Sequence, residues 1–598
     1  MRVGVDCGGT FTDFIAWDGS VLRSLKVRST PHDPASAILE GLANFAPAEI
    51  IHGATVATNA LLQRTGARTA FVTTKGFEDI LELARQNRAS LYDWTPERRP
   101  SIVPATLRFG VSERTLSDGS VLRPLRHSDL KGLSRSLAGA ESVAVCLLHS
   151  YANPEHERFV GRTLRKAGFE VSLSSEILPE YREYERAATT VVNAYVSPLV
   201  GRYMQSLDRA LPRVRLRIFQ SNGGSVSVSE ATSQAVRTVL SGPAGGVVGA
   251  AAVARTLGID RFISLDMGGT STDVSLYDGS LSYTTEGAAA GLPVRVPMLD
   301  IVTTGAGGGS IARIDEGAAL RVGPRSAGAV PGPVCYGVGE ELTVTDANLL
   351  LGRIDAGSFP SGTIRLDADR AREFAMKTGR SAGVPLRDLA LAIVRAANAR
   401  MERAIRSVSV ERGHRPRDYA LISFGGAGPL HACELADSLE IERVVVPAHA
   451  GVLSALGMLV ADCVRDYSAS VLNTDLDAAF GRLESAARTD MQAEGFPALA
   501  LTRSLDMRYE GQSYELEVPC EQAGRFDDVH RKRFGYCHQG RPTEAVTARV
   551  RAVGQMPGSA RPDLSSSSDE PRFASVYVPD GWRVQEGAGS SLVLERHS

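Results

Sequence analysis

One pattern occurs twice in this chain, and its repetition limits the fold more than any other feature. Residues 3–19 read VGVDCGGTFTDFIAWDG, and residues 263–279 read ISLDMGGTSTDVSLYDG. A constant offset of 260 residues aligns an Asp, a Gly-Gly-Thr turn, a Thr-Asp pair and a final Asp-Gly. Apolar and polar residues alternate on both sides of the glycines, which predicts two strands joined by a tight turn in each copy. The duplication therefore predicts two similar domains that face one another.

The residues of the two turns suit the binding of phosphate. Glycine has no Cβ, so backbone N–H groups can approach an anion closely. The hydroxyl groups add donors, and carboxylates can hold a cation that offsets phosphate charge. We therefore expect a nucleotide phosphate tail between the two turns. The candidate residues are Asp6, Gly8, Gly9, Thr10, Thr12 and Asp13 in the first copy, and Asp266, Gly268, Gly269, Thr270, Thr272 and Asp273 in the second.

Two further glycine-rich segments follow the second copy. Residues 305–309 read GAGGG, which is more glycine than a plain turn needs, and we expect a cradle for phosphate or substrate from Gly305, Gly307 and Gly308. Residues 424–432 read FGGAGPLHA after a predicted strand, an order that lets adenosine or phosphate sit on a helix end at Gly425 and Gly426. Neither segment is a Walker A loop or a clean GxGxxG. For His431 we favour a structural role over that of a ligand.

Two other groups of polar residues keep two interpretations each. Thr55, Thr58 and Asn59 open a predicted helix, where they either face a ligand or include an N-cap at Thr55. Arg85, Gln86, Arg88, Tyr92 and Trp94 form either a substrate-facing loop or a solvated helix end.

Composition narrows the class of protein. The chain has 598 residues, of which 43% are hydrophobic and 22% charged, as in a globular protein of several domains. The formal net charge is -2, so we expect no nucleic-acid or membrane-surface partner. No apolar run is long enough to span a bilayer. Seven scattered cysteines without a CxxC pair, and an N-terminus without a signal-peptide pattern, predict a cytoplasmic protein.

Many segments together resemble one family. The chain resembles the hydantoinase A / 5-oxoprolinase family of ATP-dependent enzymes, which also includes the nucleotide-binding subunits of acetone and acetophenone carboxylases. The resemblance runs from residue 3 to about residue 468, and more weakly to residue 551. In chain order the matching segments are VGVDCGGTFTD, HGATVATNALL, TKGFEDILELARQNR, LPEYREYERAATTVVNAYV, SNGG, SGPAGG, SLDMGGTSTDV, GAGGGSIA, GPRSAGAVPGPVCYG, TVTDANLLLGR, FGGAGPLHA and GVLSALGML.

The resemblance implies a fold and a reaction. The fold class is α/β, with duplicated actin/sugar-kinase/Hsp70-like ATPase domains at 1–190 and 191–470. A smaller C-terminal α+β domain would occupy 471–598, trimmed relative to the family. Mg²⁺ and ATP would lie in the cleft, with Asp6 and Asp266 on the metal and Gly425-Gly426 beside the adenosine. The γ-phosphoryl group would pass to a cyclic amide such as 5-oxoproline or a hydantoin, with Asp13 or Asp273 orienting substrate or metal.

The resemblance also leaves alternatives open. A hydantoinase B-like subunit is the expected partner, and a homodimer is the other assembly considered. A second hypothesis is the nucleotide-binding subunit of an ATP-dependent ketone carboxylase. A third is a non-enzymatic actin-like scaffold that binds ATP. The glycine-rich segment at 305–309 argues weakly against the scaffold, because a pure assembly protein does not need a second glycine cradle.

Overall fold

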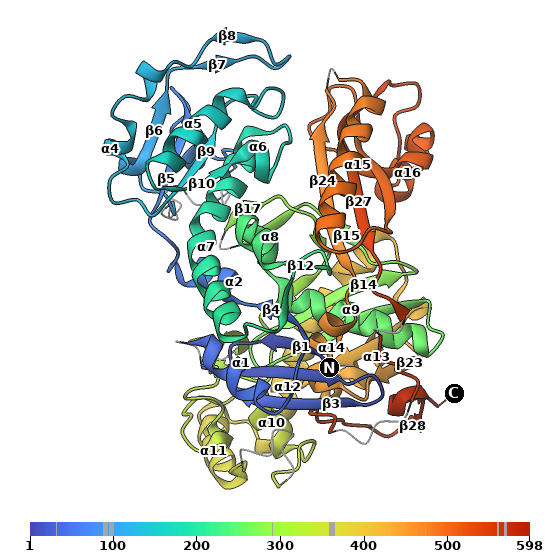
Figure 1. Cartoon of the computed structure of the whole chain (residues 1–598). Helices are drawn as coiled ribbons and strands as arrows, with labels where there is room; N and C mark the ends of the chain where they lie inside the picture. The colour runs from blue at the N-terminus through green and yellow to red at the C-terminus, as the bar shows by residue number, and fades with distance from the viewer. Residues whose placement is uncertain are drawn as a thin grey trace.

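The computed structural model describes most of the chain as four connected units (Figure 1). Two sheets form the body, and a four-stranded insertion and a C-terminal α+β unit rise side by side from the same end of it. The described residues are 1–30, 33–87, 92, 94, 101–289, 291–317, 319–357, 365–472, 474–558, 561–566 and 571–597, without the side chains of 381–382. No helix in these ranges is long and apolar enough to cross a membrane.

The first predicted hairpin forms the centre of a six-stranded sheet. The order is β12-β11-β4-β1-β2-β3, with β1, β2 and β3 antiparallel and β1, β4 and β11 parallel. Val3 and Val5 alternate with polar positions and are fully buried, as the sequence pattern predicts. The bounds are β1 Arg2–Cys7, β2 Phe11–Trp17, β3 Leu22–Arg28, β4 Glu49–Ala54, β11 Arg215–Phe219 and β12 Ser225–Ser227.

The second hairpin forms the centre of a corresponding seven-stranded sheet. The order is β19-β14-β13-β22-β23-β29-β28, in which β13, β22 and β23 are parallel and β14 and β19 antiparallel to their neighbours. The order β3-β2-β1-β4-β11 in the first sheet corresponds to the order β19-β14-β13-β22-β23 in the second. This correspondence confirms the duplicated fold class. The bounds are β13 Arg261–Met267, β14 Thr272–Asp278, β19 Val302–Thr304, β22 Ala420–Phe424, β23 Arg443–Val446, β28 Trp582–Glu586 and β29 Leu592–Arg596.

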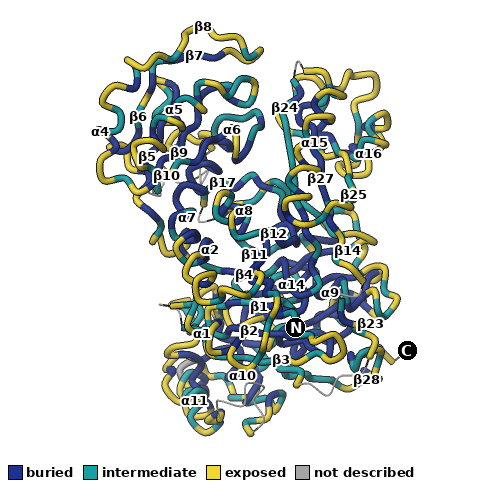
Figure 2. The backbone as a smooth tube through the Cα atoms, viewed as in Figure 1, coloured by how far each residue is buried: buried dark blue, intermediate teal, exposed yellow. Residues whose placement is uncertain are grey.

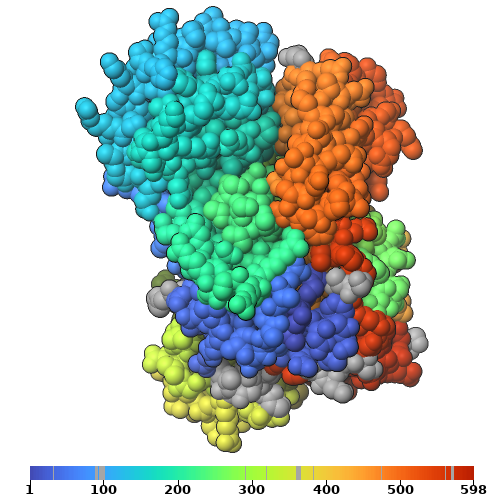
Figure 3. Space-filling view, viewed as in Figure 1, coloured from blue at the N-terminus to red at the C-terminus, as the bar shows by residue number. Residues whose placement is uncertain are grey.

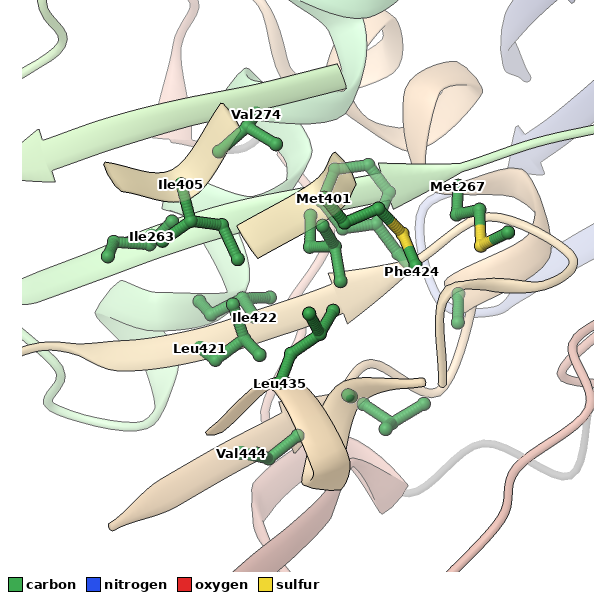
Figure 4. Packing of buried hydrophobic residues seen from close by; sticks show 14 of the residues in the cluster. Ile263, Met267, Val274, Met401, Ile405, Leu421, Ile422, Phe424, Leu435 and Val444 are labelled. Carbon is green, nitrogen blue, oxygen red and sulfur yellow. The ribbon is translucent and has the colours of Figure 1, made fainter. Parts of the chain in front are cut away.

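The largest hydrophobic core includes both faces of the second sheet. On one face, Ile263, Val274 and Leu421 belong to the same cluster as Met401 and Ile405 of the long helix α12, Leu386–Val408 (Figure 4). The apolar residues of α12 recur at helical spacing, so one stripe of the helix is buried. Figure 2 shows the same buried centre continuing through both sheets of the body.

The insertion is a parallel sheet that rests on one long helix. Its order is β10-β9-β5-β6, with bounds β5 Thr69–Thr74, β6 Arg108–Val111, β9 Ser142–Cys146 and β10 Glu170–Leu173. Helix α7, Glu183–Ala210, packs Ala187, Val191 and Ala194 into the insertion core, and Val192 and Val196 into the first-domain core. Because α7 is apolar on both sides, it joins the two units rigidly.

The C-terminal unit is a four-stranded antiparallel sheet with two helices. Its order is β24-β27-β25-β26, with bounds β24 Cys463–Ser470, β25 Ala500–Tyr509, β26 Leu516–Pro519, β27 Thr543–Gly554, α15 Leu476–Ala493 and α16 Phe526–Phe534. Strands β25 and β26 pair antiparallel. The domain ranges 1–190, 191–470 and 471–598 remain a prediction, and strand pairing gives two reasons to redraw them. β11 and β12 belong to the first sheet, and the C-terminal hairpin β28–β29 adds to the second sheet through β23.

The remaining elements complete the surface of these units. The other helices are α1 Pro34–Leu42, α2 Val56–Gln63, α3 Ile80–Leu83, α4 Leu133–Ser136, α5 Glu155–Lys166, α6 Ser174–Ile177, α8 Val228–Ser233, α10 Val344–Leu350, α11 Ala368–Ala382 and α13 Ala432–Ser438. The other strands are β7 Arg114–Thr115, β8 Val121–Arg123, β15 Tyr283–Thr284, β16 Gly287–Ala289, β17 Leu292–Val294, β18 Met298–Leu299, β20 Ser310–Ile314 and β21 Leu320–Ser326.

Two helices between the sheets touch backbone to backbone. They are α9, Ser241–Thr256, and α14, Leu453–Val460. A Cβ placed on Gly457 would lie 1.8 Å from the carbonyl oxygen of Gly245, and one on Gly249 would lie 2.5 Å from that of Leu453. A Cβ on Gly4 of β1 would lie 2.1 Å from the carbonyl oxygen of Ala455, so α14 also lies directly on the first sheet. Glycine at these positions sets the spacing of the two halves.

Gly457→Ala is therefore expected to destabilise the protein by about 2 kcal/mol or more, because the new methyl group must force two backbones apart. Gly481→Ala is a matched control, since Gly481 is an exposed helical residue whose Cβ would meet nothing within 4 Å. It should stabilise α15 by about 0.5–1 kcal/mol. Urea unfolding of both variants tests this, and equal midpoints for the two variants would contradict the close packing.

Candidate nucleotide and metal site

Two rows of directly paired residues, one in each sheet, contain the four predicted carboxylates. In an antiparallel pair, directly opposite residues point to the same face of the sheet. Asp6 therefore shares a face with Asp13, and Asp266 shares one with Asp273. The full rows are Lys26, Asp13, Asp6 and Gly53 in the first sheet, and Thr303, Asp273, Asp266 and Phe424 in the second.

The start of α9 brings the two rows together. A Cβ on Gly242 would lie 3.7 Å from Asp6 Oδ1, and one on Gly246 would lie 3.3 Å from Asp266 Oδ2. The first turns of this helix thus pass both carboxylates. The N-terminal end of a helix favours negative charge because its first N–H groups have no partner within the helix. The small residues of this SGPAGG segment allow both close packing on α14 and the approach of an anion.

The site carries more negative charge than the described residues neutralise. Burial, followed by the charge of Asp13, raises the pKa of Asp6 to about 7. Burial and then the charges of Asp273, Asp6 and Asp13 raise the pKa of Asp266 well above its ordinary value. Burial also raises the pKa of Asp273 to about 6. It raises the pKa of Asp13 as well, against the effect of the Lys26 ammonium.

This set of residues fits a divalent cation that is bound jointly with phosphate. Asp6 Oδ1 is buried and has no hydrogen-bond partner among the described residues, a condition that a cation or its bound water would relieve. In the described part of the chain, no group of three His, Cys, Asp or Glu residues could hold a metal alone. Mg²⁺ commonly takes one or two carboxylates and completes its shell with water and phosphate oxygens.

The tips of both turns are open to an anion. The turns are closed by equivalent bonds, from Gly8 N–H to the Phe11 carbonyl at 3.0 Å and from Gly268 N–H to the Ser271 carbonyl at 3.1 Å. A Cβ on Gly9 or on Gly269 would meet nothing within 4 Å. The next residues, Thr10 and Thr270, are half-buried and exposed respectively. The backbone at both tips can therefore approach a phosphate group, as the sequence predicts.

Thr12 and Thr272 do not face this opening. Both are fully buried, and the register pairs Thr12 with Cys7 and Thr272 with Met267, on the face opposite to the carboxylates. The Thr12 hydroxyl contacts Cys7 Sγ at 3.6 Å, and the Thr272 hydroxyl donates to the Ala306 carbonyl. Their prediction as phosphate ligands is corrected, because strand alternation turns them into the sheet interior.

The Gly305–Gly309 segment braces the second turn. Gly308 N–H donates to the Gly268 carbonyl at 3.0 Å, Gly309 N–H to the Gly269 carbonyl at 2.7 Å, and Gly307 N–H to Ser310 Oγ at 2.8 Å. A Cβ on Gly307 would lie 2.7 Å from the backbone of Gly269. The N–H groups of Gly307 and Gly308 are therefore already used, and a Cβ on Gly305 would lie 3.0 Å from Pro324 Cβ, so these glycines permit close packing. A phosphate cradle at Gly305, Gly307 and Gly308 stays a prediction.

The Gly425-Gly426 pair borders the second carboxylate row. Gly425 has a positive φ of 75°, and a Cβ there would lie 2.5 Å from Asp266 Oδ1. Gly426 is exposed, and its Cβ would meet nothing within 4 Å. Gly425 therefore makes room for the carboxylate, while Gly426 leaves open space beside it, where the adenosine is expected.

His431 is a structural residue, as the sequence interpretation favoured. It is fully buried, and its ring nitrogens lie 2.6 Å from Asn398 Oδ1 and 3.2 Å from Asn348 Nδ2. Burial lowers the pKa of His431 to about 4, so the ring is neutral at physiological pH. Two satisfied nitrogens leave it no capacity to bind a ligand.

Of the other polar candidates, those that begin α2 have structural partners, whereas the second group includes exposed residues. Thr55 Oγ1 donates to the Cys7 carbonyl at 3.0 Å and makes no N-cap bond, so the capping alternative is wrong for this side chain. Thr58 Oγ1 accepts from Leu240 N–H at 2.9 Å, and Asn59 Nδ2 donates to Thr55 Oγ1 at 3.3 Å. In the second group, Arg85 pairs with Glu185, Tyr92 and Trp94 are each 92% exposed, and Arg88 lies outside the described residues.

A cavity of about 980 Å³ lies away from the two turns. It is lined by residues of α9, the tip of the second hairpin and the C-terminal unit, including Tyr283 and Arg551. Arg551 pairs with Asp466 at 2.7 Å and lies 3.4 Å from the centroid of the Tyr283 ring. None of the predicted turn residues lines this cavity, so its size does not identify the phosphate site.

One residue of the site was missed by the sequence interpretation. Lys26 lies opposite Asp13 and its Nζ is 2.5 Å from Asp13 Oδ1. It lies in β3, outside every motif that the sequence analysis singled out. Its counterpart Thr303 follows a long insertion after the second hairpin, so the constant offset of 260 residues does not relate the two positions. Only the three-strand register reveals the correspondence.

The fold is that of a duplicated actin-like ATPase, and its two Gly-Gly-Thr turns carry paired carboxylates. Comparison with known sequences agrees with this class. The hydantoinase/oxoprolinase family matches residues 186–467, and the N-terminal region of that family matches residues 2–168. The chain belongs to the hydantoinase/oxoprolinase family.

Three relatives illustrate the range of the family. Caprolactamase subunit alpha of Pseudomonas jessenii is 36% identical over 97% of this chain and 90% of its own length. The crystal structure of ATP-dependent caprolactamase from that organism has a TM-score of 0.89, with 32% identity and complete coverage of both chains. Acetone carboxylase in a nucleotide-free structure has a TM-score of 0.78 and 25% identity, and covers 100% of this chain and 99% of its own. For 5-oxoprolinase 1 of Arabidopsis thaliana, identity is 34%, and the match spans 97% of this chain but 52% of the relative.

Asp6→Asn is expected to raise the stability of the metal-free protein at pH 8. With a native pKa of about 7 against 3.8, Asp6 keeps a proton that the unfolded chain has lost, so its contribution to stability falls as pH rises between these values. Asparagine removes this effect, which is on the order of a few kcal/mol. Thermal unfolding in EDTA from pH 5 to pH 8 measures it.

Asp208→Asn, on the exposed face of α7, is the control and should leave the pH profile unchanged. The same Asp6→Asn variant should lose the extra stabilisation that Mg²⁺ adds to ATP. A lower unfolding midpoint for Asp6→Asn at pH 8, or unchanged Mg²⁺ dependence, would contradict the assignment of Asp6.

Proposed function

We propose that this chain is an ATP-dependent hydrolase, or a subunit of one, that phosphorylates and opens a cyclic amide such as 5-oxoproline or a hydantoin. The observation that carries the proposal is the pair of open Gly-Gly-Thr turns, each beside buried carboxylates whose charge is not neutralised. Perturbed acidic groups of this kind are typical of sites that bind or transform ligands. The family relationship supplies the reaction class, since two of the named relatives are a caprolactamase and a 5-oxoprolinase.

The chemistry requires activation of the ring. An amide carbonyl is a poor electrophile, and phosphorylation of its oxygen creates a leaving group that commits the ring to opening by water. Phosphoryl transfer needs little covalent participation by protein, so positioning and charge stabilisation provide most of the rate. The backbone at Gly9 and Gly269 would bind the phosphate oxygens, and the first turns of α9 would add a favourable dipole.

The carboxylates divide the remaining work. Asp6 and Asp266 would hold Mg²⁺, directly or through water, and Mg²⁺ when bound would offset the phosphate charge. Asp13 and Asp273 lie on the neighbouring strand of each sheet, directly opposite Asp6 and Asp266. They would orient the acceptor or the metal-bound water. Gly425 and Gly426 would border the adenosine.

The assembly is part of the same proposal. The relative in Pseudomonas jessenii is named a subunit alpha, and we propose that this chain likewise acts with a hydantoinase B-like partner that completes ring opening. A homodimer is the alternative assembly, and the cytoplasm is the proposed location.

A second candidate has its own support. Acetone carboxylase matches the whole chain at a TM-score of 0.78, and the same phosphate site could serve a ketone carboxylase that phosphorylates an enolised ketone. The two functions share every residue assigned above and differ in the acceptor. A scaffold that binds ATP without chemistry would use the same carboxylates to hold Mg²⁺ and ATP, and it differs from both enzymes in that no acceptor would stimulate ADP release.

The deciding experiment measures ADP release by the purified chain, alone and with a co-expressed hydantoinase B-like partner. Acceptors are 5-oxoproline, hydantoins, simple lactams, and ketones with and without bicarbonate. A cyclic amide should stimulate ADP release. Asp266→Asn should lower the stimulated rate by about 100-fold or more, which is the effect of losing a transition-state contact.

Bicarbonate-dependent stimulation by a ketone would instead establish the carboxylase. Tight ATP binding with the same ADP release under every condition would contradict both enzymatic proposals. Asp208→Asn serves again as the control for purification and handling.

A further inference from the structure

The two carboxylate rows are related by the duplication but end differently. Asp13 is paired across the sheet with Lys26, whereas the equivalent Asp273 is paired with Thr303. Lys26 Nζ lies 2.5 Å from Asp13 Oδ1, and Thr303 Oγ1 donates to Asp273 Oδ1 at the same distance of 2.5 Å. One half of the site thus has an ammonium where the other half has a hydroxyl.

The ammonium is directed into the site. The Lys26 side chain is only 14% exposed, and that of Asp13 is 16% exposed. The charge of Lys26 acts on Asp6 in its own half and reaches Asp266 in the other half. Its Nζ also lies 5.1 Å from the centroid of the Phe11 ring, in the same turn as Gly9. The Lys26 ammonium is therefore largely buried at Asp13, within electrostatic reach of carboxylates in both halves of the site.

The Lys26 ammonium has more N–H donors than it has hydrogen-bond partners in the described structure. An ammonium group has three N–H donors, and the described structure shows one hydrogen bond, to Asp13. Asp13 fixes the position of the nitrogen, and the other two donors have no partner among the described residues that would prevent a bond to phosphate. Lysine binds phosphate as a compact point charge, which suits charge that develops on a transferring phosphoryl group.

We propose that Lys26, held by Asp13, is the side chain that binds the transferring phosphoryl group, and that Thr303, its counterpart beside Asp273, makes no such contact. This proposal rests on the proposed function, because it needs a phosphoryl group that leaves ATP. It gives the two equivalent positions different tasks. The ammonium of Lys26 stabilises the transition state, whereas the hydroxyl of Thr303 contributes equally to ground state and transition state.

The duplication provides a matched control for the test. Lys26→Met removes the ammonium, and Thr303→Val removes the hydroxyl at the equivalent position. Isothermal titration in the presence of Mg²⁺ measures the affinity for ADP and for ADP with fluoroaluminate, which mimics the transferring group. We expect Lys26→Met to weaken fluoroaluminate-dependent binding by about 100-fold or more, and to change the affinity for ADP alone less than about 5-fold.

Thr303→Val should change both affinities by a similar, small factor. In steady-state assays Lys26→Met should lower kcat with little change in the KM for ATP, and Lys26→Arg should recover part of kcat because it restores a cation. Equal loss for ADP and for the fluoroaluminate complex in Lys26→Met, or an equal selective loss in Thr303→Val, would overturn the proposal.

A charge-balanced variant protects the test against misfolding. Lys26→Met leaves Asp13 buried without its cation, which can destabilise the fold. Lys26→Met/Asp13→Asn removes both charges and should show the same selective loss of fluoroaluminate-dependent binding. If the double variant binds the complex as wild type does, Lys26 has no such role.

The two proposals fail in different ways. The proposed function fails if no acceptor stimulates ADP release by the wild-type chain with its partner. The role of Lys26 fails if wild type binds the fluoroaluminate complex tightly and the lysine variants do so as well.

Discussion

The backbone contact between α9 and α14 is the constraint on which the rest of the structure depends. Glycines at Gly245, Gly249 and Gly457 let the helices meet without intervening side chains, and Gly4 lets α14 lie directly on β1. This spacing fixes the two sheets relative to each other, so the two duplicated turns approach the same space. Figure 3 shows the first domain, the insertion and the C-terminal unit packed against one another on one face of the molecule. It also carries the start of α9 past Asp6 and Asp266. Without that proximity the duplication would produce two separate hairpins rather than one site.

The site is held in an electrostatically unfavourable state that a ligand can relieve. Burial is the main reason that the pKa values of Asp6, Asp266 and Asp273 are raised, and repulsion between the carboxylates adds to it for Asp6 and Asp266. Lys26 supplies one positive charge to this group and therefore leaves most of the repulsion in place. A protein tolerates such a cost where the same charges bind a cation with its phosphate, and stability is then regained on binding.

The sequence predicted the parts of the site that depend on local pattern. The paired Asp residues and the open glycines were found because a turn between two alternating strands is a local feature, and its repetition excluded chance. Thr12 and Thr272 were misassigned because the motif was treated as a unit, although strand alternation alone turns every second residue away. The roles of Gly307 and Gly308 depend on a distant turn that packs on them, and the role of Lys26 depends on a third strand, so neither was visible in a linear motif.

The central claim is that one nucleotide phosphate chain lies between the two duplicated turns. A crystal structure with Mg²⁺ and a non-hydrolysable ATP analogue tests it most directly. The account predicts phosphate oxygens in contact with the backbone at both Gly9 and Gly269, and a metal ion whose shell includes Asp6 or Asp266. A nucleotide bound elsewhere, for instance in the cavity beside Tyr283 and Arg551, with both turns empty, would contradict it.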